Sequence, residues 1–188
     1  MTTRYECGMR ERLDDPAGDV RITRLDTFVD AQIEALADLL IDAIESGAGV
    51  SFLHPLEPEK ARRFWRGIAA DVAAGDRALV VAEDEHGIVG TVQLVLAQPE
   101  NQPHRADLSK MLVHRRGRRR GIGAALLDAA EQVARDCGKT LLVLDTNTGS
   151  DAERLYGRAG WVRLGEIPDF SVQPRGGLRA TTVFYKQL

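Results

Sequence analysis

Long apolar runs and cysteines are scarce in this 188-residue sequence, and each shortage excludes a class of protein. No segment approaches the roughly 18 uninterrupted apolar residues of a membrane span, and the N-terminus lacks the apolar core of a signal peptide. The two cysteines, Cys7 and Cys137, have no metal-ligand spacing and are too few for a disulfide framework. We therefore expect a cytoplasmic protein with no membrane partner, no metal site and two free thiols.

Positive charge is not in excess either. The formal net charge is −3 and the isoelectric point is about 5.8, so no overall basic field would attract nucleic acid. The length and the 44% hydrophobic content are sufficient for one buried core, so we expect a single domain over residues 19–188. Residues 1–18 show neither helical nor strand periodicity and are expected to form a flexible leader.

The spacing of apolar residues predicts both helices and strands. Intervals of three and four residues predict helices that begin near Asp30, Glu57, Ile122 and Ser150. Runs rich in β-branched residues predict strands. The expected strands cover residues 20–25, a hairpin within 78–97, and then 105–113, 141–145, 161–167 and 181–188. This order predicts an α+β fold whose sheet is parallel where a helix intervenes and antiparallel elsewhere.

The segment MLVHRRGRRRGIGAALL, residues 111–127, is the most informative part of the chain. Gly121 and Gly123 lie between a predicted strand and a predicted helix, where a backbone without Cβ atoms can approach a ligand closely. Unpaired amides at the start of the helix, together with the helix dipole, form a seat for a diphosphate. Five arginines add positive charge around it: Arg115, Arg116, Arg118, Arg119 and Arg120.

Other meanings of this segment are less favoured. A basic run is often a nucleic-acid or targeting patch, but this chain has no other basic surface and no aromatic residues interleaved with the arginines. A P-loop would need Lys and then Ser or Thr after its glycines, and here Ala124 and Ala125 follow. A dinucleotide fold would need three spaced glycines after an N-terminal strand, which the upstream hairpin contradicts.

The order strand, Arg118-x-x-Gly121-x-Gly123, helix, strand, Leu155-Tyr156 resembles the acetyl-CoA signature of the GNAT superfamily of N-acetyltransferases, over about residues 78–188. The resemblance implies a three-layer α/β/α fold with a mixed, mostly antiparallel sheet, helices on both faces, and a splay between the fourth and fifth strands. It also implies acetyl-CoA as the cosubstrate, with its pantetheine arm in that gap and its diphosphate on the glycine-led loop. The implied contacts are Met111, Leu112 and Val113 for the arm, and Arg118, Arg119, Arg120, Gly121, Ile122, Gly123 and Ala124 for the diphosphate.

A narrower resemblance, over about residues 47–188, is to the tabtoxin-resistance acetyltransferases. It depends on GVSF (49–52), DVAAG (71–75), RADLSKMLV, LLVLDT, GEIP (165–168) and the tail TTVFYKQL. Those enzymes acetylate a β-lactam dipeptide toxin on its amine. The implied acceptor is therefore the primary amine of a small molecule, such as an amino acid, a dipeptide or a toxin-like compound, and the implied role is toxin resistance. The oligomeric state stays open, with a homodimer among the options.

Acetyl transfer to an amine requires a group that removes a proton and a group that stabilises the departing thiolate. Asp107 lies on the predicted strand that leads to the diphosphate loop, and Asp145 ends the next predicted strand, so both would face the acceptor in a splayed sheet. They are our candidates for the general base or amine anchor, and the narrower resemblance supports them. The alternatives are a surface partner of Arg105 or Lys110 for Asp107, and a helix cap or turn former for Asp145.

The resemblance also assigns roles around the last helix. Tyr156 matches the tyrosine that acts as general acid toward the CoA sulfur in many GNAT enzymes, although a tyrosine in this position is more often a core residue. The family often has Asn seven residues before this Tyr, to bind pantetheine, where this chain has Gly149. Asn147 or Ser150 would have to take over that contact.

Three aromatic residues are candidates for the wall of the acceptor cleft: Phe52, Trp65 and Phe170. Their alternative is core packing or an ordered surface loop. Two other functions also stay open at this point. One is an acyl-CoA-binding regulatory module without turnover, and the other is an N-acetyltransferase that acts on a protein or peptide.

Overall fold

The computed structural model describes residues 19–188, and the predicted leader and Cys7 lie outside this part of the chain. Seven strands form one sheet in the order β1-β2-β3-β4-β5-β7-β6. The strands are β1 (Arg21–Leu25), β2 (Arg77–Asp84), β3 (Gly87–Val95), β4 (Arg105–Val113), β5 (Leu141–Asn147), β6 (Val162–Val172) and β7 (Leu178–Gln187). The helices are α1 (Asp30–Glu45), α2 (Pro58–Ala74), α3 (Ile122–Asp136) and α4 (Asp151–Arg158), with a short 3₁₀ helix at Arg115–Gly117.

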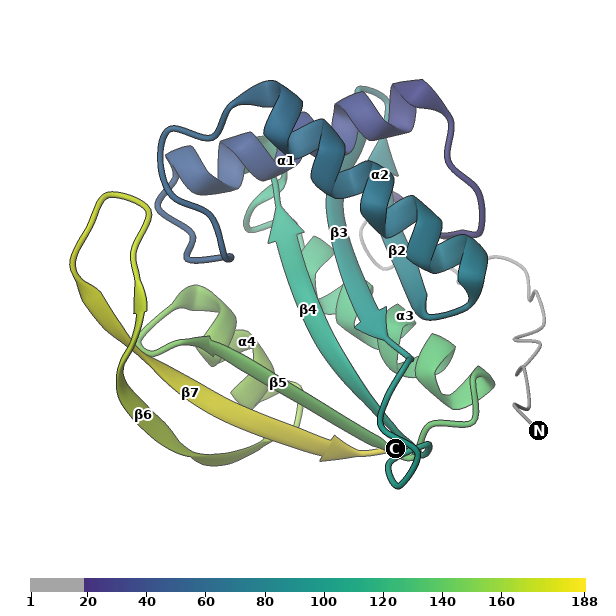
Figure 1. Ribbon diagram of the computed structural model, residues 1–188, viewed down its shortest axis with the longest axis vertical. Coiled ribbons are helices and arrows are strands. Elements are labelled where there is room, and N and C mark those ends of the chain that lie inside the picture. The colour runs from purple at the N-terminus through teal and green to yellow at the C-terminus, as the bar shows by residue number, and fades with distance from the viewer. Residues whose placement is uncertain (1–18) are drawn as a thin grey trace.

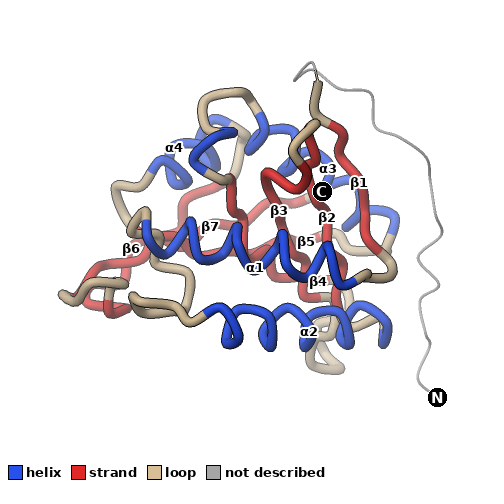
Figure 2. The backbone as a smooth tube through the Cα atoms, turned by 90° about the horizontal axis from the view of Figure 1, so that it is seen from above, coloured by secondary structure: helices blue, strands red, loops and turns tan. Residues whose placement is uncertain are grey.

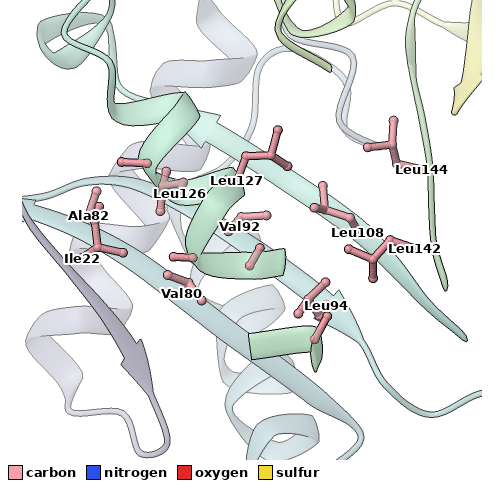
Figure 3. Close-up of a cluster of buried hydrophobic side chains, with 14 of the residues drawn as sticks. Ile22, Val80, Ala82, Val92, Leu94, Leu108, Leu126, Leu127, Leu142 and Leu144 are labelled. Carbon is pink, nitrogen blue, oxygen red and sulfur yellow. The ribbon is translucent and has the colours of Figure 1, made fainter. Parts of the chain in front are cut away.

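The sheet is covered on both faces, because its central strands are apolar on both sides. In β2, Val80 packs into a cluster with α3, whereas its neighbours Leu79 and Val81 pack into a second cluster with α1 and α2. Figure 2 shows the three layers, with α1 and α2 on one side of the sheet and α3 and α4 on the other. In Figure 3, Leu126 and Leu127 of α3 reach down to the side chains of the strands. The predicted three-layer α/β/α fold is confirmed.

The sheet opens between β4 and β5. All neighbouring strands are antiparallel except these two, which are parallel and pair only over Arg105–Asp107 with Leu141–Val143. Beyond these three pairs the strands diverge, as Figure 1 shows. From residue 108 to 113, β4 keeps β3 as a neighbour, but no strand within residues 19–188 pairs with its other edge. The splay predicted between the fourth and fifth strands is therefore present.

A bulge in β4 lies beside this opening. The register of β3 with β4 shifts between Thr91 and Gln93, so that the segment between Ser109 and Leu112 has one residue more than the strand opposite. Lys110 lies in the bulge with a φ of 50°, in the left-handed region that few residues with a side chain adopt. The bulge therefore changes the direction of side chains at the point where the sheet opens.

Two expectations need correction. The strand predicted for residues 161–167 runs on to Val172, because β6 and β7 form a long hairpin whose turn lies only at residues 173–177. Cys137 is disulfide-bonded and is not a free thiol. Sequence spacing could not reveal a single bridge, since its formation depends on how the fold places the sulfur atoms. No helix in the described part of the chain is both long and apolar enough to cross a membrane.

Candidate functional site

The start of α3 has the local geometry that the predicted anion seat requires. Gly121 is the N-cap residue, with a φ of 80° and no side-chain cap. The first intrahelical bond comes from the amide of Ala124 to the Gly121 carbonyl, at 3.0 Å. Within residues 19–188, no acceptor is found for the amides of Ile122 and Gly123, which precede it. Two free amides at the positive end of a helix dipole fit a diphosphate of the kind that coenzyme A carries.

Two carboxylates hold the arginine-rich loop in front of this helix. Asp42 of α1, whose side chain is only 6% exposed, accepts hydrogen bonds from the Arg115 guanidinium and from the Arg115 amide, at 3.0 Å for the latter. Its carboxylate also lies 3.5 Å from His114 Nε2 and 4.0 Å from the Arg118 guanidinium. Asp42 therefore connects the first helix to the diphosphate loop.

Asp84 of β2 is the second carboxylate of this kind. It pairs with Arg116 and, at 3.3 Å, with Arg120. The hydrogen bond from Arg116 lowers the pKa of Asp84 to about 2, with help from the His86 amide. In the described part of the chain, Arg119 alone of the five arginines has no carboxylate within the 4.0 Å of an ion pair, so its charge is available to a ligand.

A pocket of about 400 Å³ lies where β4 and β5 separate. Both candidate aspartates line it, together with Phe170. The remaining lining residues come from β4, β5, β6 and β7: Leu108, Ser109, Val143, Leu144, Ile167, Thr181 and Val183. The fold therefore brings together Asp107 and Asp145, which are far apart in the sequence, at one opening in the sheet.

The two aspartates differ in their surroundings. The Asp107 carboxylate accepts hydrogen bonds from Gln98 at 3.2 Å and from Arg105 at 3.4 Å, which is the surface pairing we considered as its alternative. The Asp145 carboxylate accepts a hydrogen bond from the Thr181 hydroxyl at 2.8 Å. Because no guanidinium among residues 19–188 pairs with it, Asp145 is the better placed of the two to receive a proton or bind an ammonium.

Tyr156 is buried in α4, on the side of the sheet that α3 covers. Its ring packs against Trp161 and Phe184, with ring centres 5.7 Å and 6.0 Å away. Burial raises the pKa of Tyr156, and the negative charge of Asp145 raises it further. The phenol is therefore a protonated donor at neutral pH, although Tyr156 is not among the residues that line the pocket.

The turn between β5 and α4 explains why this chain has Gly149. Its φ of 77° suits glycine, and its amide donates to the Glu153 carboxylate, which also orders the first turn of α4. The neighbouring candidates already have protein partners. Asn147 donates to Gln173 at 2.9 Å, and Ser150 caps α4 by accepting from the Glu153 amide at 3.1 Å. A pantetheine contact from either side chain would have to share these groups.

The three aromatic candidates are distributed over different environments. Phe170 lines the pocket. Trp65 is fully buried between α1 and α2, which is the core packing we considered as its alternative. Phe52 packs edge-on against Phe64 at 5.2 Å, in the loop between those helices. The structure therefore brings only Phe170 to the aspartates.

Sequence reasoning missed several residues of this site. Asp42 and Asp84 hold the arginine loop, Thr181 donates to Asp145, and Lys110 lies in the β4 bulge. One signal was available for Asp42, because an acidic residue within the apolar run of α1 indicates a buried ion pair. Nothing in the local sequence marks the other three.

Comparisons with known proteins agree with this geometry. The model of the acetyltransferase (GNAT) family matches residues 34–161. A protein described as an uncharacterized N-acetyltransferase in the hisH-hisA intergenic region of Azospirillum brasilense is 32% identical over 129 residues, which are 68% of this chain and 75% of that protein.

Two solved structures share the fold. The yncA protein of Salmonella typhimurium, solved with acetyl-CoA, superposes with a TM-score of 0.74 at 19% identity, over 91% of this chain and 95% of that one. A ribosomal-protein-alanine N-acetyltransferase of Brucella melitensis superposes with a TM-score of 0.73 at 23% identity, over 89% and 99%. This chain belongs to the GNAT family of acetyl-CoA-dependent acetyltransferases.

Proposed function

We propose that the protein transfers the acetyl group of acetyl-CoA to the primary amine of a small molecule, with Asp145 as the general base or amine anchor. The observation that carries this proposal is the pocket at the β4–β5 opening, which both candidate aspartates line. The glycine-led start of α3, which would seat the diphosphate, is joined to the end of β4 by the short arginine-rich loop. Carrier site and acceptor pocket therefore share one gap in the sheet.

The residues at this gap divide the chemistry between them. Acetyl-CoA, when bound, supplies an activated thioester. Asp145 takes the proton that the acceptor ammonium must lose before its nitrogen can attack the carbonyl carbon. As the new C–N bond forms and the C–S bond breaks, Tyr156 donates its proton to the departing sulfur, and the second proton that the nitrogen loses on becoming an amide restores the phenol. Asp107 also lines the pocket, where it is bonded to Arg105, and remains the second candidate for the base.

The donor side uses backbone groups and one free arginine. The amides of Ile122 and Gly123 and the side chain of Arg119 would hold the diphosphate, and the unpaired edge of β4 at Met111, Leu112 and Val113 would accompany the pantetheine arm. Residues Arg118, Arg120 and Ala124 complete this loop. Among residues 19–188, no group of three or more His, Cys, Asp or Glu side chains could hold a metal ion. The proposed reaction uses no metal ion.

A small acceptor is favoured by contacts that bridge the opening. The loop after α1 is attached to β4 through Ser51 and Lys110, at 3.1 Å, and to the β6–β7 turn through the His54 amide and the Pro174 carbonyl, at 2.8 Å. Arg175 of that turn donates to the Glu45 carbonyl at 3.3 Å. A loop tied down at both ends leaves less room for an extended peptide than for a small molecule. The narrower resemblance to toxin-resistance enzymes also suggests a small amino compound.

The test is release of free thiol from acetyl-CoA with a panel of small amines, short peptides and an intact protein substrate. We expect turnover with small amines. Turnover with peptides or protein alone would move the assignment to a protein N-acetyltransferase, as the name of the Brucella relative would allow. Tight acetyl-CoA binding without turnover on any acceptor would instead indicate a regulatory module.

A further inference from the structure

Lys110 shares the α1–α2 face of the sheet with both aspartates. On β4, Leu108 and Met111 pack toward the α3 side although they are three residues apart, so the bulge turns both Ser109 and Lys110 to the opposite face. Asp107 lies on that face because its neighbours Ala106 and Leu108 point toward α3. Leu142 and Leu144 of β5 also pack on the α3 side, which places Asp145 on the same face as Lys110.

The side chain of Lys110 is held in place by uncharged groups. Its ammonium lies 3.1 Å from the Ser51 hydroxyl and 5.9 Å from the centre of the Phe64 ring. Asp107, on the same face, pairs with Arg105, and Asp145 acts on Lys110 only through its longer-range charge. Within residues 19–188, no carboxylate lies within ion-pair distance of Lys110.

The electrostatic state of Lys110 reflects this environment. Burial lowers the pKa of Lys110, and the positive charge of Arg77 lowers it further, while the charge of Asp145 partly opposes both effects. A half-buried ammonium without a carboxylate partner retains a desolvation penalty, and an anion brought by a ligand would reduce that penalty. A positive charge beside an amine-binding pocket would also disfavour an acceptor that carries only a positive charge.

We propose that Lys110 and Ser51 form a subsite for the carboxylate of the acceptor, so that the enzyme prefers a small amino acid or related amino-carboxylate to a simple amine. The acceptor amine would face Asp145 while its carboxylate faces Lys110. Asp145, which lines the pocket, and Lys110, which follows the lining residue Ser109 on the same face of the sheet, carry charges that are complementary to a molecule with both groups. This inference rests on the proposed function, because it names the acceptor class of the same reaction.

The experiment compares each of a set of α-amino acids with its own carboxamide, which keeps the amine but removes the negative charge. For the wild-type enzyme we expect kcat/KM in the thiol-release assay to be at least about tenfold higher for the acids. Lys110→Gln should reduce the acid-to-amide ratio to near one, mainly through KM, and Lys110→Arg should retain most of it. The matched control is Lys60→Gln, because Lys60 also lies over an aromatic ring, Phe52 at 5.8 Å, but is exposed on α2.

Calorimetric titration of the same acids and amides into the CoA-saturated protein separates this inference from the proposed function. If no acceptor is turned over, the proposed function fails, but a preference for binding acids that Lys110→Gln removes would still support the subsite. Equal use or binding of acids and amides by the wild type would overturn the inference while leaving the acetyltransferase intact. An equal loss of both in Lys110→Gln, with an unchanged melting temperature, would also overturn it.

Discussion

The proposed donor and acceptor sides of the β4–β5 opening differ in whether their charged side chains are paired with opposite charges. On the donor side, Asp42 and Asp84 neutralise the arginines of the loop, and the ligand is left mainly with backbone amides. On the acceptor side, Asp145 and Lys110 are not paired with oppositely charged side chains at ion-pair distance within residues 19–188. On the donor side, the ion pairs hold the arginine-rich loop in one position, which suits a ligand that is always the same, acetyl-CoA. In the proposed reaction, the unpaired charges would make the choice of acceptor depend on the charges that the acceptor carries.

The largest expected effect comes from removing the charge of Asp145. Asp145→Asn should lower kcat/KM about 100-fold in the thiol-release assay, because the group that accepts the proton is lost. Affinity for acetyl-CoA, measured by calorimetry, should stay close to the wild-type value, since the donor side is untouched. Asp107→Asn should cost less, because Arg105 and Gln98 already engage that carboxylate. A larger loss in Asp107→Asn than in Asp145→Asn would exchange their roles.

Low pH should reduce the stability of the protein, because Asp84 loses its charge when it is protonated. The folded-state pKa of about 2 lies below the ordinary value of 3.8, so Asp84 contributes stability that is fully present above pH 4 and is lost as the pH falls through 2. This contribution is of the order of 2 kcal/mol, because the Asp84 side chain is almost wholly buried. Urea unfolding of the wild type and of Asp84→Asn between pH 5 and about pH 2 tests it. Parallel curves for the two proteins would show that Asp84 is not the responsible group.

Removing the charge of Asp42 on α1 should weaken the binding of acetyl-CoA but leave the acetyl-transfer step unchanged. We expect Asp42→Asn to weaken acetyl-CoA binding about tenfold, because Arg115 and Arg118 lose the charge that positions them. The turnover number at saturating acetyl-CoA should change little. The control is Asp38→Asn, an exposed acid one turn earlier on the same helix. Equal acetyl-CoA affinity in both variants would contradict a role for Asp42 in positioning the loop.

The smallest expected effect tests the backbone of the anion seat. Gly121→Ala forces a residue with a side chain into the left-handed region and should cost about 1 kcal/mol of stability, with a loss of acetyl-CoA affinity of a few fold. A Cβ at Gly121 would meet no atom within 4 Å, so the effect would come from the backbone alone. Gly67→Ala is the matched control: it also meets nothing, but it lies within α2 and should stabilise the protein by up to about 1 kcal/mol.

The proposed donor side could be located from the sequence more completely than the proposed acceptor side, and the reason is physical. The anion seat is one continuous segment, in which strand, glycines and helix follow one another, so its local pattern contains the whole site. The acceptor side draws on Ser51, Lys110, Asp145 and Thr181, which come from four separate segments. Only the fold determines that these residues meet.

The fold itself followed from local patterns with few exceptions. The helical stripe of α2 contains Trp65 and Ile68, and both are buried, so Trp65 belongs to the core and not to the wall of the pocket. The end of β6 was missed because this strand is exposed along most of its length, as Leu164 and Phe170 show. Without one buried face, the strand has no strict alternation that would mark its end.

The short parallel ladder between β4 and β5 has a consequence for how the protein handles its carrier. Three residue pairs are the sole strand pairing, within residues 19–188, between the β1–β4 part of the sheet and the β5–β7 part. Beyond them, the amides and carbonyls on one edge of β4 must be solvated by water or bonded to a ligand. A bound pantetheine arm would act as a substitute strand there, so that the sheet becomes continuous only while the enzyme is loaded.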